Sequence, residues 1–330
     1  MYKADGGVIE LYNQSLRTMH LGCVKLSNYF KQNFSSSSDD DSTVHLNEKN
    51  EKIKCPAQIT GNNFIYISEP FLRYIWCYSY HIMSCWHGEN LRLNNKYEID
   101  RIEYFLNESH SVLNYGDSLW TAYSDWPDYL PSPIKSSSIL GLDDNFKIIK
   151  LVNGYFAVQL LAILLHELGH KVYGHNRYAP DNDNQEREEE NHADEQAVSV
   201  FLECIDNRDE RSIYKIPYLL TYGAFLHQVP LPIPSTHPAE HLRFDHVLAK
   251  LMENTVDKKH ATEESFYNDS DGLLYIISIF VFMKWLETRH SKNVSSNISG
   301  KDILNYTQKE WYQAVFEEVK KLVDSKLSNQ

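Results

Sequence analysis

The clearest hydrophobic pattern in the chain is a nearly continuous apolar run from Tyr155 to Leu165, which leads directly into the segment HELGHKVYGH. The length and the leucine content of this run favour a buried helix over a strand. Gly174 and then Pro180 supply the stop signals for that helix. The polar and acidic residues at 176–189 are expected to form a loop after it.

A second helix is expected after this loop, because small and apolar residues recur at helical spacing. They are Ala193, Ala197, Val198, Phe201 and Leu202. Small residues on this face would let the second helix pack closely on the first. Two more core helices are predicted at roughly 272–288 and 306–326 by the same periodicity.

The first half of the chain gives weaker patterns. Residues Phe64 to Ile82 begin with strand-like alternation and become a dense aromatic segment after Pro70, which favours a helix. The polar run at 33–43 cannot bury apolar surface, so a flexible segment is expected near 33–50. The chain is therefore predicted to be α+β and mostly α, with a mixed α/β region at 1–150 and a helical core at 151–330.

Composition narrows the class of protein. The formal net charge of −13 argues against binding to nucleic acid or to an anionic membrane, because phosphate contacts need clustered Lys and Arg. The five cysteines are irregularly spaced and include no CxxC pair, which favours a reducing compartment. The longest apolar run is taken as Leu273 to Met283, which Ser278 interrupts, and it is far shorter than the roughly 20 residues needed to cross a bilayer. A cytoplasmic protein without a membrane span is expected.

The first candidate for chemistry is the HExxH motif formed by His166, Glu167 and His170. Two histidines four residues apart lie on one face of a helix, so both imidazoles can reach a single zinc ion. Glu167 lies one step round the helix and can take a proton from a water molecule at the ion. Chance would place this short motif in roughly one such sequence in 20, in which case two ordinary histidines occupy a buried helix.

A catalytic zinc ion needs a third protein ligand and an open position. Glu190 is the best candidate, and Asp194, four residues on, faces the same way and can accept a hydrogen bond from a ligand histidine. Glu189 and His192 are competing ligands, although His192 lies about 200° round the helix from Glu190. An alternative is that this acidic run is simply a solvated helix face. His175 is interpreted as a helix-end histidine rather than a ligand.

At these residues the chain resembles the gluzincin metallopeptidases, and HELGH followed by E-x-x-A-D-x-x-A is similar to the peptidase M48 pattern. The resemblance extends to Ser235-Thr236-His237-Pro238 with Arg243 six residues after the histidine. It implies a zincin-like core in which the HExxH helix packs on a helix that bears the Glu ligand. It also implies that His237 stabilises the oxyanion, and Arg243 is expected to pair with a carboxylate near the site.

Two departures from that pattern point to a different branch. M48 members usually carry transmembrane helices, and the gap between HExxH and Glu190 is short here. The chain looks most like the soluble Lit-type phage-exclusion peptidases, the peptidase U49 family. That resemblance implies a cytosolic protein substrate cleaved after phage infection, and an activating peptide or protein as a partner. The alternatives are an ImmA-like peptidase that degrades a repressor or antitoxin, and a non-catalytic zinc-binding module.

Overall fold

The structure is a computed structural model that describes part of the chain. The described residues are 5–22, 28, 44–47, 51–60, 64–93, 99–133, 143–175, 183–205, 208–228, 240–253, 274, 277, 278, 280, 281 and 284.

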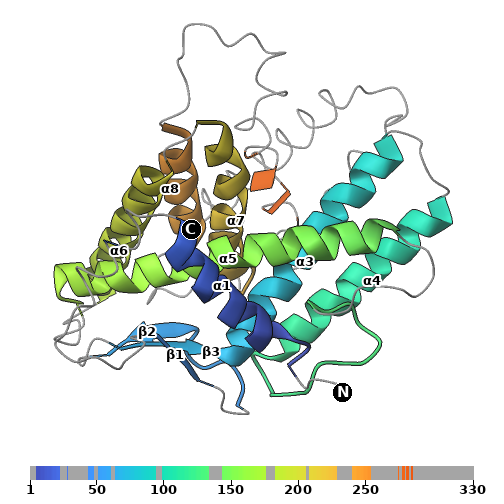
Figure 1. The fold of residues 1–330 in the computed structure, drawn as a ribbon, viewed down its shortest axis with the longest axis horizontal. Helices are drawn as coiled ribbons and strands as arrows, with labels where there is room; N and C mark the ends of the chain where they lie inside the picture. Colours follow the sequence, from blue (N-terminus) through green and yellow to red (C-terminus); the bar gives the residue numbers. More distant parts are fainter. Residues whose placement is uncertain are drawn as a thin grey trace, which may run out of the picture.

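A long helix, α5 (Asp143–Tyr173), runs through the middle of the molecule, and the other elements are arranged around it (Figure 1). They are α1 (Val8–Gly22), β1 (Val44–Asn47), β2 (Ala57–Ile59), β3 (Ile65–Ser68), α3 (Glu69–Leu93), α4 (Ile99–Ser118), α6 (Asp183–Cys204), α7 (Arg208–Gln228) and α8 (Glu240–Glu253). Helix α5 contacts α1, α3, α6, α7 and β2. A helix surrounded in this way must be apolar on nearly every side, which explains the unbroken apolar run in the sequence.

By length and composition α5 is also the one helix among the described residues that could cross a membrane. Its apolar window has a mean hydropathy of 1.9, and 67% of that window is buried inside the protein. The residues that make it apolar, such as Phe156, Leu160 and Leu164, are in the hydrophobic core. Its apolar character is therefore accounted for by packing within the protein.

Helix α3 supplies the aromatic part of the core. Pro70 occupies its first turn, where the missing N–H costs nothing because the first backbone donors of a helix have no helical partner. Buried aromatic side chains then follow along both sides of the helix: Phe71, Tyr74, Trp76, Tyr78 and Tyr80. The expected change from strand to aromatic helix at this point is confirmed, since β3 ends at Ser68 and α3 begins at Glu69.

The three strands form one small sheet in the order β1-β3-β2, with β1 parallel and β2 antiparallel to β3. Strand β2 is at the edge of this sheet, against α5. The Pro56 carbonyl accepts from Ser68 and the Thr60 N–H donates to Phe64, so the backbone groups of Ala57 and Ile59 face away from β3. The outer edge of β2 therefore faces the region next to α5.

The prediction of a mostly α protein with a small sheet is confirmed. One boundary was wrong: α6 begins at Asp183, so the second part of the acidic run assigned to a loop is helical. Acidic side chains in the first turns of a helix interact favourably with its positive end, which offsets their mutual repulsion. Strand β1 occupies 44–47 of the segment expected to be flexible. The proposed helix at 306–326 lies outside the described residues, and the division at 150 stays a prediction.

An ion pair in the core fixes the start of α3. Arg73 pairs with Glu69, and both side chains are at most 3% exposed. The guanidinium also donates to the Tyr115 hydroxyl at 2.9 Å and to the Ser124 carbonyl at 2.9 Å. Every charge in this group is thus compensated within the protein, and removing one member would leave another buried without its partner.

We predict that Arg73→Met lowers the free energy of unfolding by about 3–5 kcal/mol, because the buried Glu69 carboxylate would lose the guanidinium that pairs with it. The matched control is Lys54→Met, since Lys54 forms an exposed pair with Glu51 in which the side chains are 66% and 50% exposed. Such a pair contributes about 1 kcal/mol or less. Urea unfolding of the three proteins measures the difference, and equal losses in the two variants would contradict the assignment.

Candidate metal centre

The site begins with an unusually close approach of α5 and α6. A Cβ atom added to Gly169 would lie 2.7 Å from the Cα atom of Ala193 and 2.8 Å from its carbonyl oxygen. No side chain fits between two backbones at that distance, so the glycine within the HExxH motif is required by the packing. Ala193 and Ala197 are fully buried, which confirms that small residues form this face of α6.

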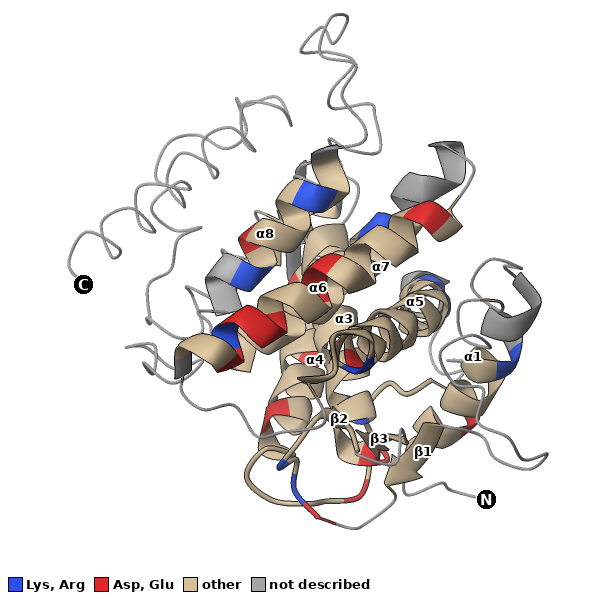
Figure 2. Ribbon diagram, turned by 90° about the vertical axis from the view of Figure 1, so that its left-hand side faces the viewer, with Lys and Arg blue, Asp and Glu red and all other residues tan. Residues whose placement is uncertain are grey.

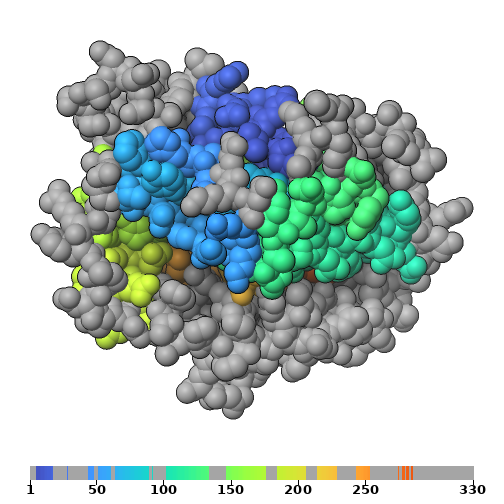
Figure 3. Space-filling model, turned by 90° about the horizontal axis from the view of Figure 1, so that it is seen from below, coloured from blue at the N-terminus to red at the C-terminus, as the bar shows by residue number. Residues whose placement is uncertain are grey.

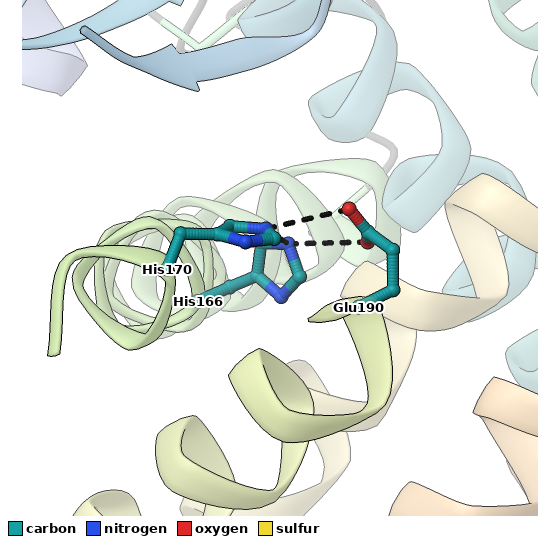
Figure 4. Close-up of side chains that lie close together, drawn as sticks. All are labelled: His166, His170 and Glu190. Atoms are coloured by element: carbon teal, nitrogen blue, oxygen red, sulfur yellow. Dashed lines mark hydrogen bonds and ion pairs between the residues drawn. The ribbon is translucent and has the colours of Figure 1, made fainter. Parts of the chain in front are cut away.

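This contact brings three side chains together at one point (Figure 4). The Nε2 atoms of His166 and His170 are 3.1 Å apart, and the Glu190 carboxylate lies 3.4 Å from the first and 3.3 Å from the second. Both imidazoles come from α5 and the carboxylate comes from α6. Among the described residues, these three form a group whose ligand atoms all lie within 4.8 Å of one another.

The spacing and the donor set both suit a zinc ion. Four ligands at about 2.0–2.1 Å in a tetrahedron stand about 3.3–3.4 Å from one another, which is close to the separations seen here. Two imidazole nitrogens and one carboxylate are also a common ligand set for catalytic zinc. His166, His170 and Glu190 are therefore the residues that would hold the ion, as the motif spacing predicted.

Asp194 connects the cluster to its surroundings. Its carboxylate accepts a hydrogen bond from His166 Nδ1 at 2.8 Å and another from the Tyr222 hydroxyl at 3.0 Å. Arg243 donates to it twice, at 2.7 Å from Nε and 2.9 Å from Nη2. With Nδ1 of His166 engaged in this way, Nε2 is directed at the cluster. The structure thus places Asp194 and Arg243 behind the candidate ligands, where the sequence had suggested a supporting role.

Arg243 also bridges Asp194 and Glu190 of α6, because its Nη1 atom lies 3.0 Å from the Glu190 carboxylate. Burial disfavours the charged form of both carboxylates, but Arg243 and the neighbouring His166 together outweigh it. The pKa of Asp194 is lowered to about 2, and the pKa of Glu190 is held well below its usual range. Both groups are therefore anionic at neutral pH, which is the state in which a carboxylate binds a metal.

Glu167 has a different environment. Its side chain is buried, with 7% of the residue exposed, and burial raises its pKa above the usual range. The nearby imidazoles of His166 and His170 and a hydrogen bond from the Ile59 backbone oppose part of that rise. Strand β2 therefore holds the carboxylate that the motif assigns as the base. No local pattern in the chain predicted that this strand would lie beside Glu167.

His175 also contacts the cluster, which sequence reasoning did not anticipate. Its Nδ1 atom lies 3.2 Å from Nδ1 of His170. Gly174 adopts a φ of 75° and ends α5, so the chain turns back and His175 returns to the helix it has just left. The signal in the sequence was the glycine that separates the two residues, because a left-handed turn is what reverses the direction of the chain there.

The competing ligands point elsewhere. Glu189 accepts a hydrogen bond from Gln185 at 2.9 Å. His192 is exposed and packs beside Tyr173 and His175, with ring centroids 5.2 and 6.0 Å away. The alternative of a solvated acidic face is correct for other parts of α6, where Glu188, Glu195 and Glu203 are exposed and acidic positions recur along the ribbon (Figure 2). His237 lies outside the described residues, so its expected role in stabilising an oxyanion stays a prediction.

A pocket of about 320 Å³ lies in front of the cluster. Segment 56–59, including β2, forms one wall, and the remaining lining comes from α5, α6, α7 and Arg243 of α8. Seen from below, the blue surface of the sheet region lies directly beside the yellow-green surface of the α5–α6 region (Figure 3). The pocket therefore places His166, His170, Glu167 and Glu190 next to the edge of the sheet.

This arrangement defines a helical protein with a half-buried His-His-Glu cluster, a buried glutamate beside it and an adjoining pocket. Comparison with protein-family models matches residues 65–263, more than half of the chain, to the family Peptidase U49. The chain belongs to that peptidase family, as its motifs indicated. Searches of curated proteins and of solved structures give no significant match.

We predict that Gly169→Ala destabilises the protein by about 1–3 kcal/mol, because the added methyl group must push α5 and α6 apart. Glu190 would move with α6, so zinc affinity should also fall. Gly154→Ala is the matched control, since it lies in the same helix and its Cβ would have nothing within 4 Å. That change should stabilise α5 by up to about 1 kcal/mol. Thermal unfolding and zinc titration measure both effects, and similar behaviour of the two variants would refute the packing argument.

His166 has a raised pKa in the metal-free protein. Burial alone would lower the pKa of His166, but Asp194 and Glu190 outweigh it and raise the pKa from 6.5 to about 10. The metal-free protein therefore carries a protonated His166 at neutral pH, and the stability that this charge contributes is complete below about pH 6.5 and is lost as the pH rises to about 10. A metal ion must displace that proton, so we expect release of about one proton per zinc ion at pH 7.5.

The measurement is titration calorimetry in buffers that differ in ionisation enthalpy. Zinc affinity should rise about tenfold per pH unit between about pH 7 and pH 9, because one proton competes with the ion. Asp194→Asn removes the stronger of the two charges that raise the pKa of His166, so this variant should release fewer protons. Binding by the wild-type protein that is independent of pH over this range would exclude the assigned protonation state.

Proposed function

We propose that the chain is a zinc-dependent endopeptidase that cleaves a protein substrate in the cytoplasm. The observation that carries this proposal is the His166–His170–Glu190 cluster, with separations of 3.1–3.4 Å, at the floor of a pocket that also contains Glu167. Membership of the Peptidase U49 family supports peptide hydrolysis. Three protein ligands beside a pocket favour a catalytic site over a non-catalytic zinc-binding module, which usually closes with four.

A zinc ion bound here would supply Lewis-acid chemistry at the scissile carbonyl. Glu167 accepts a proton from the attacking water and passes it to the leaving amine, and its raised pKa suits a group that must both take and give a proton. Asp194 holds His166 in the orientation that presents Nε2. Arg243 keeps Glu190 and Asp194 anionic. His237 is proposed to stabilise the oxyanion of the tetrahedral intermediate.

The edge of β2 suggests how a substrate would lie. Ala57 and Ile59 direct their backbone groups away from β3. The Ala57 carbonyl accepts a hydrogen bond from Cys55 Sγ at 3.1 Å and the Ile59 backbone donates to Glu167, so a peptide bound along this edge would exchange these bonds for its own. An extended peptide can bind such an edge as an additional strand. Because the strand lines the pocket with the candidate ligands, a peptide on it would run past Glu167. We therefore propose an extended segment of a protein as the substrate.

The resemblance to Lit-type peptidases leads to a biological proposal. The enzyme would act in phage exclusion, cutting a protein of its own cell after infection and awaiting an activating peptide or protein. The U49 match favours this setting over an ImmA-like role in removing a repressor or antitoxin. The protease would then be inactive before its trigger.

The test compares wild type with Glu167→Gln in phage-infected bacterial cells. Both proteins should contain about one zinc ion per chain, because Glu167 is not a ligand. Cleavage should fall by at least about 100-fold in the variant, since a positioned base contributes about 10²–10⁴ to the rate. New protein N-termini, identified by mass spectrometry, report the cleavage and the substrate together.

Glu188→Gln is the matched control, because Glu188 is an exposed acid on α6 and its loss should leave cleavage unchanged. Identical new N-termini with Glu167→Gln would remove Glu167 from the role of base. A purified wild-type protein without zinc, whose cleavage survives a strong chelator, would reject the metallopeptidase proposal as a whole.

A further inference from the structure

His175 lies beside the metal cluster without belonging to it. Its Nδ1 atom approaches Nδ1 of His170 at 3.2 Å, which is the side of that imidazole turned away from Glu190. The other ligand histidine has Asp194 in the corresponding position, at 2.8 Å from its Nδ1. Each of the two ligand histidines is therefore contacted at its far nitrogen by a different kind of group.

The proton between the two Nδ1 atoms can be assigned by counting. A neutral imidazole carries one N–H and one lone pair, and a metal ion on Nε2 of His170 would use the lone pair. The hydrogen of His170 must then be on Nδ1. The His175 atom facing it at 3.2 Å must accept that hydrogen bond, because two N–H groups cannot point at each other across this distance.

The position of His175 is fixed by its neighbours. Gly174, with a φ of 75°, turns the chain, and its N–H donates to the Lys171 carbonyl at 3.0 Å. The imidazole then stacks on Tyr173, with ring centroids 5.5 Å apart and planes 14° apart, and lies 6.0 Å from the ring of His192 on α6. An acceptor placed by a turn and held by ring contacts is already oriented before a metal binds.

We propose that His175 is a positioning residue that accepts the Nδ1–H of His170 and so presents Nε2 of His170 to the metal. This inference rests on the proposed zinc site and adds to it a residue outside the motif. Asp194 orients His166 with a charged acceptor, whereas His175 orients His170 with a neutral one. The uncharged acceptor adds no further negative charge to a site that already contains three buried or half-buried carboxylates.

Three variants separate hydrogen bonding from packing. His175→Phe keeps a ring beside Tyr173 and His192 but removes the acceptor. His175→Asn removes the ring but retains an acceptor oxygen near the position of Nδ1. His192→Phe changes the neighbouring ring and leaves the contact between His170 and His175 intact. Zinc affinity is measured by competition with a chromophoric chelator, and Co²⁺ substitution gives an electronic spectrum that reports on the ligand field.

We expect His175→Phe to bind zinc about 10–100-fold more weakly, as is usual when the hydrogen-bond partner of a ligand histidine is lost. The Co²⁺ spectrum should change with it. His175→Asn should recover most of the affinity and the wild-type spectrum, and His192→Phe should match wild type. Thermal unfolding of the metal-free proteins shows whether each variant is folded.

Wild-type affinity in His175→Phe would overturn the inference while leaving the zinc site intact. Zinc binding by His175→Asn as weak as that of His175→Phe would also overturn it, because an acceptor at this position would then fail to restore the affinity. Absence of zinc binding by the wild-type protein would instead overturn the proposed function, before any variant is compared.

Discussion

The contact between Gly169 of α5 and Ala193 of α6 is the constraint on which the site depends. Two helices that touch backbone to backbone have little freedom in their relative rotation or translation, because any shift creates a clash. Glu190 and Asp194 lie three residues before and one residue after Ala193. Their direction toward His166 and His170 therefore follows from the same contact. Packing and chemistry share one interface here.

That interface concentrates negative charge, and one cation offsets it. Glu190 and Asp194 face the region between the helices, where Arg243 from α8 contacts both of them at 2.7–3.0 Å, and Glu167 lies nearby against β2. Without such a partner, carboxylates this close would take up protons and lose their ability to bind a metal. Helix α8 thus contributes to the site although it carries none of the three candidate ligands. Ion pairs of Arg243 with Glu190 and Asp194 attach α8 to α6.

The sequence was informative wherever helical spacing alone determined geometry. His166 and His170 had to share a face, as did Glu190 and Asp194, and the small residues of α6 indicated which face packs. Contacts between residues far apart in the chain could not be predicted from the sequence. Nothing in the local pattern linked Ile59 to Glu167, or Tyr222 to Asp194, because each pair is far apart in the chain. His175 was missed because helical periodicity predicts neighbours only within a continuing helix. The turn at Gly174 ends α5 and brings the chain back toward His170.

The three acids also differ in a way that separates their roles. Arg243 draws the pKa of Glu190 and Asp194 downward, whereas burial pushes the pKa of Glu167 upward. A group that must ligate or orient works best as a permanent anion, and a group that exchanges protons works best with a pKa nearer neutral. Glu167 instead accepts a hydrogen bond from the Ile59 backbone of β2. The position of one arginine, supplied from a separate helix, therefore accounts for why neighbouring carboxylates suit different tasks.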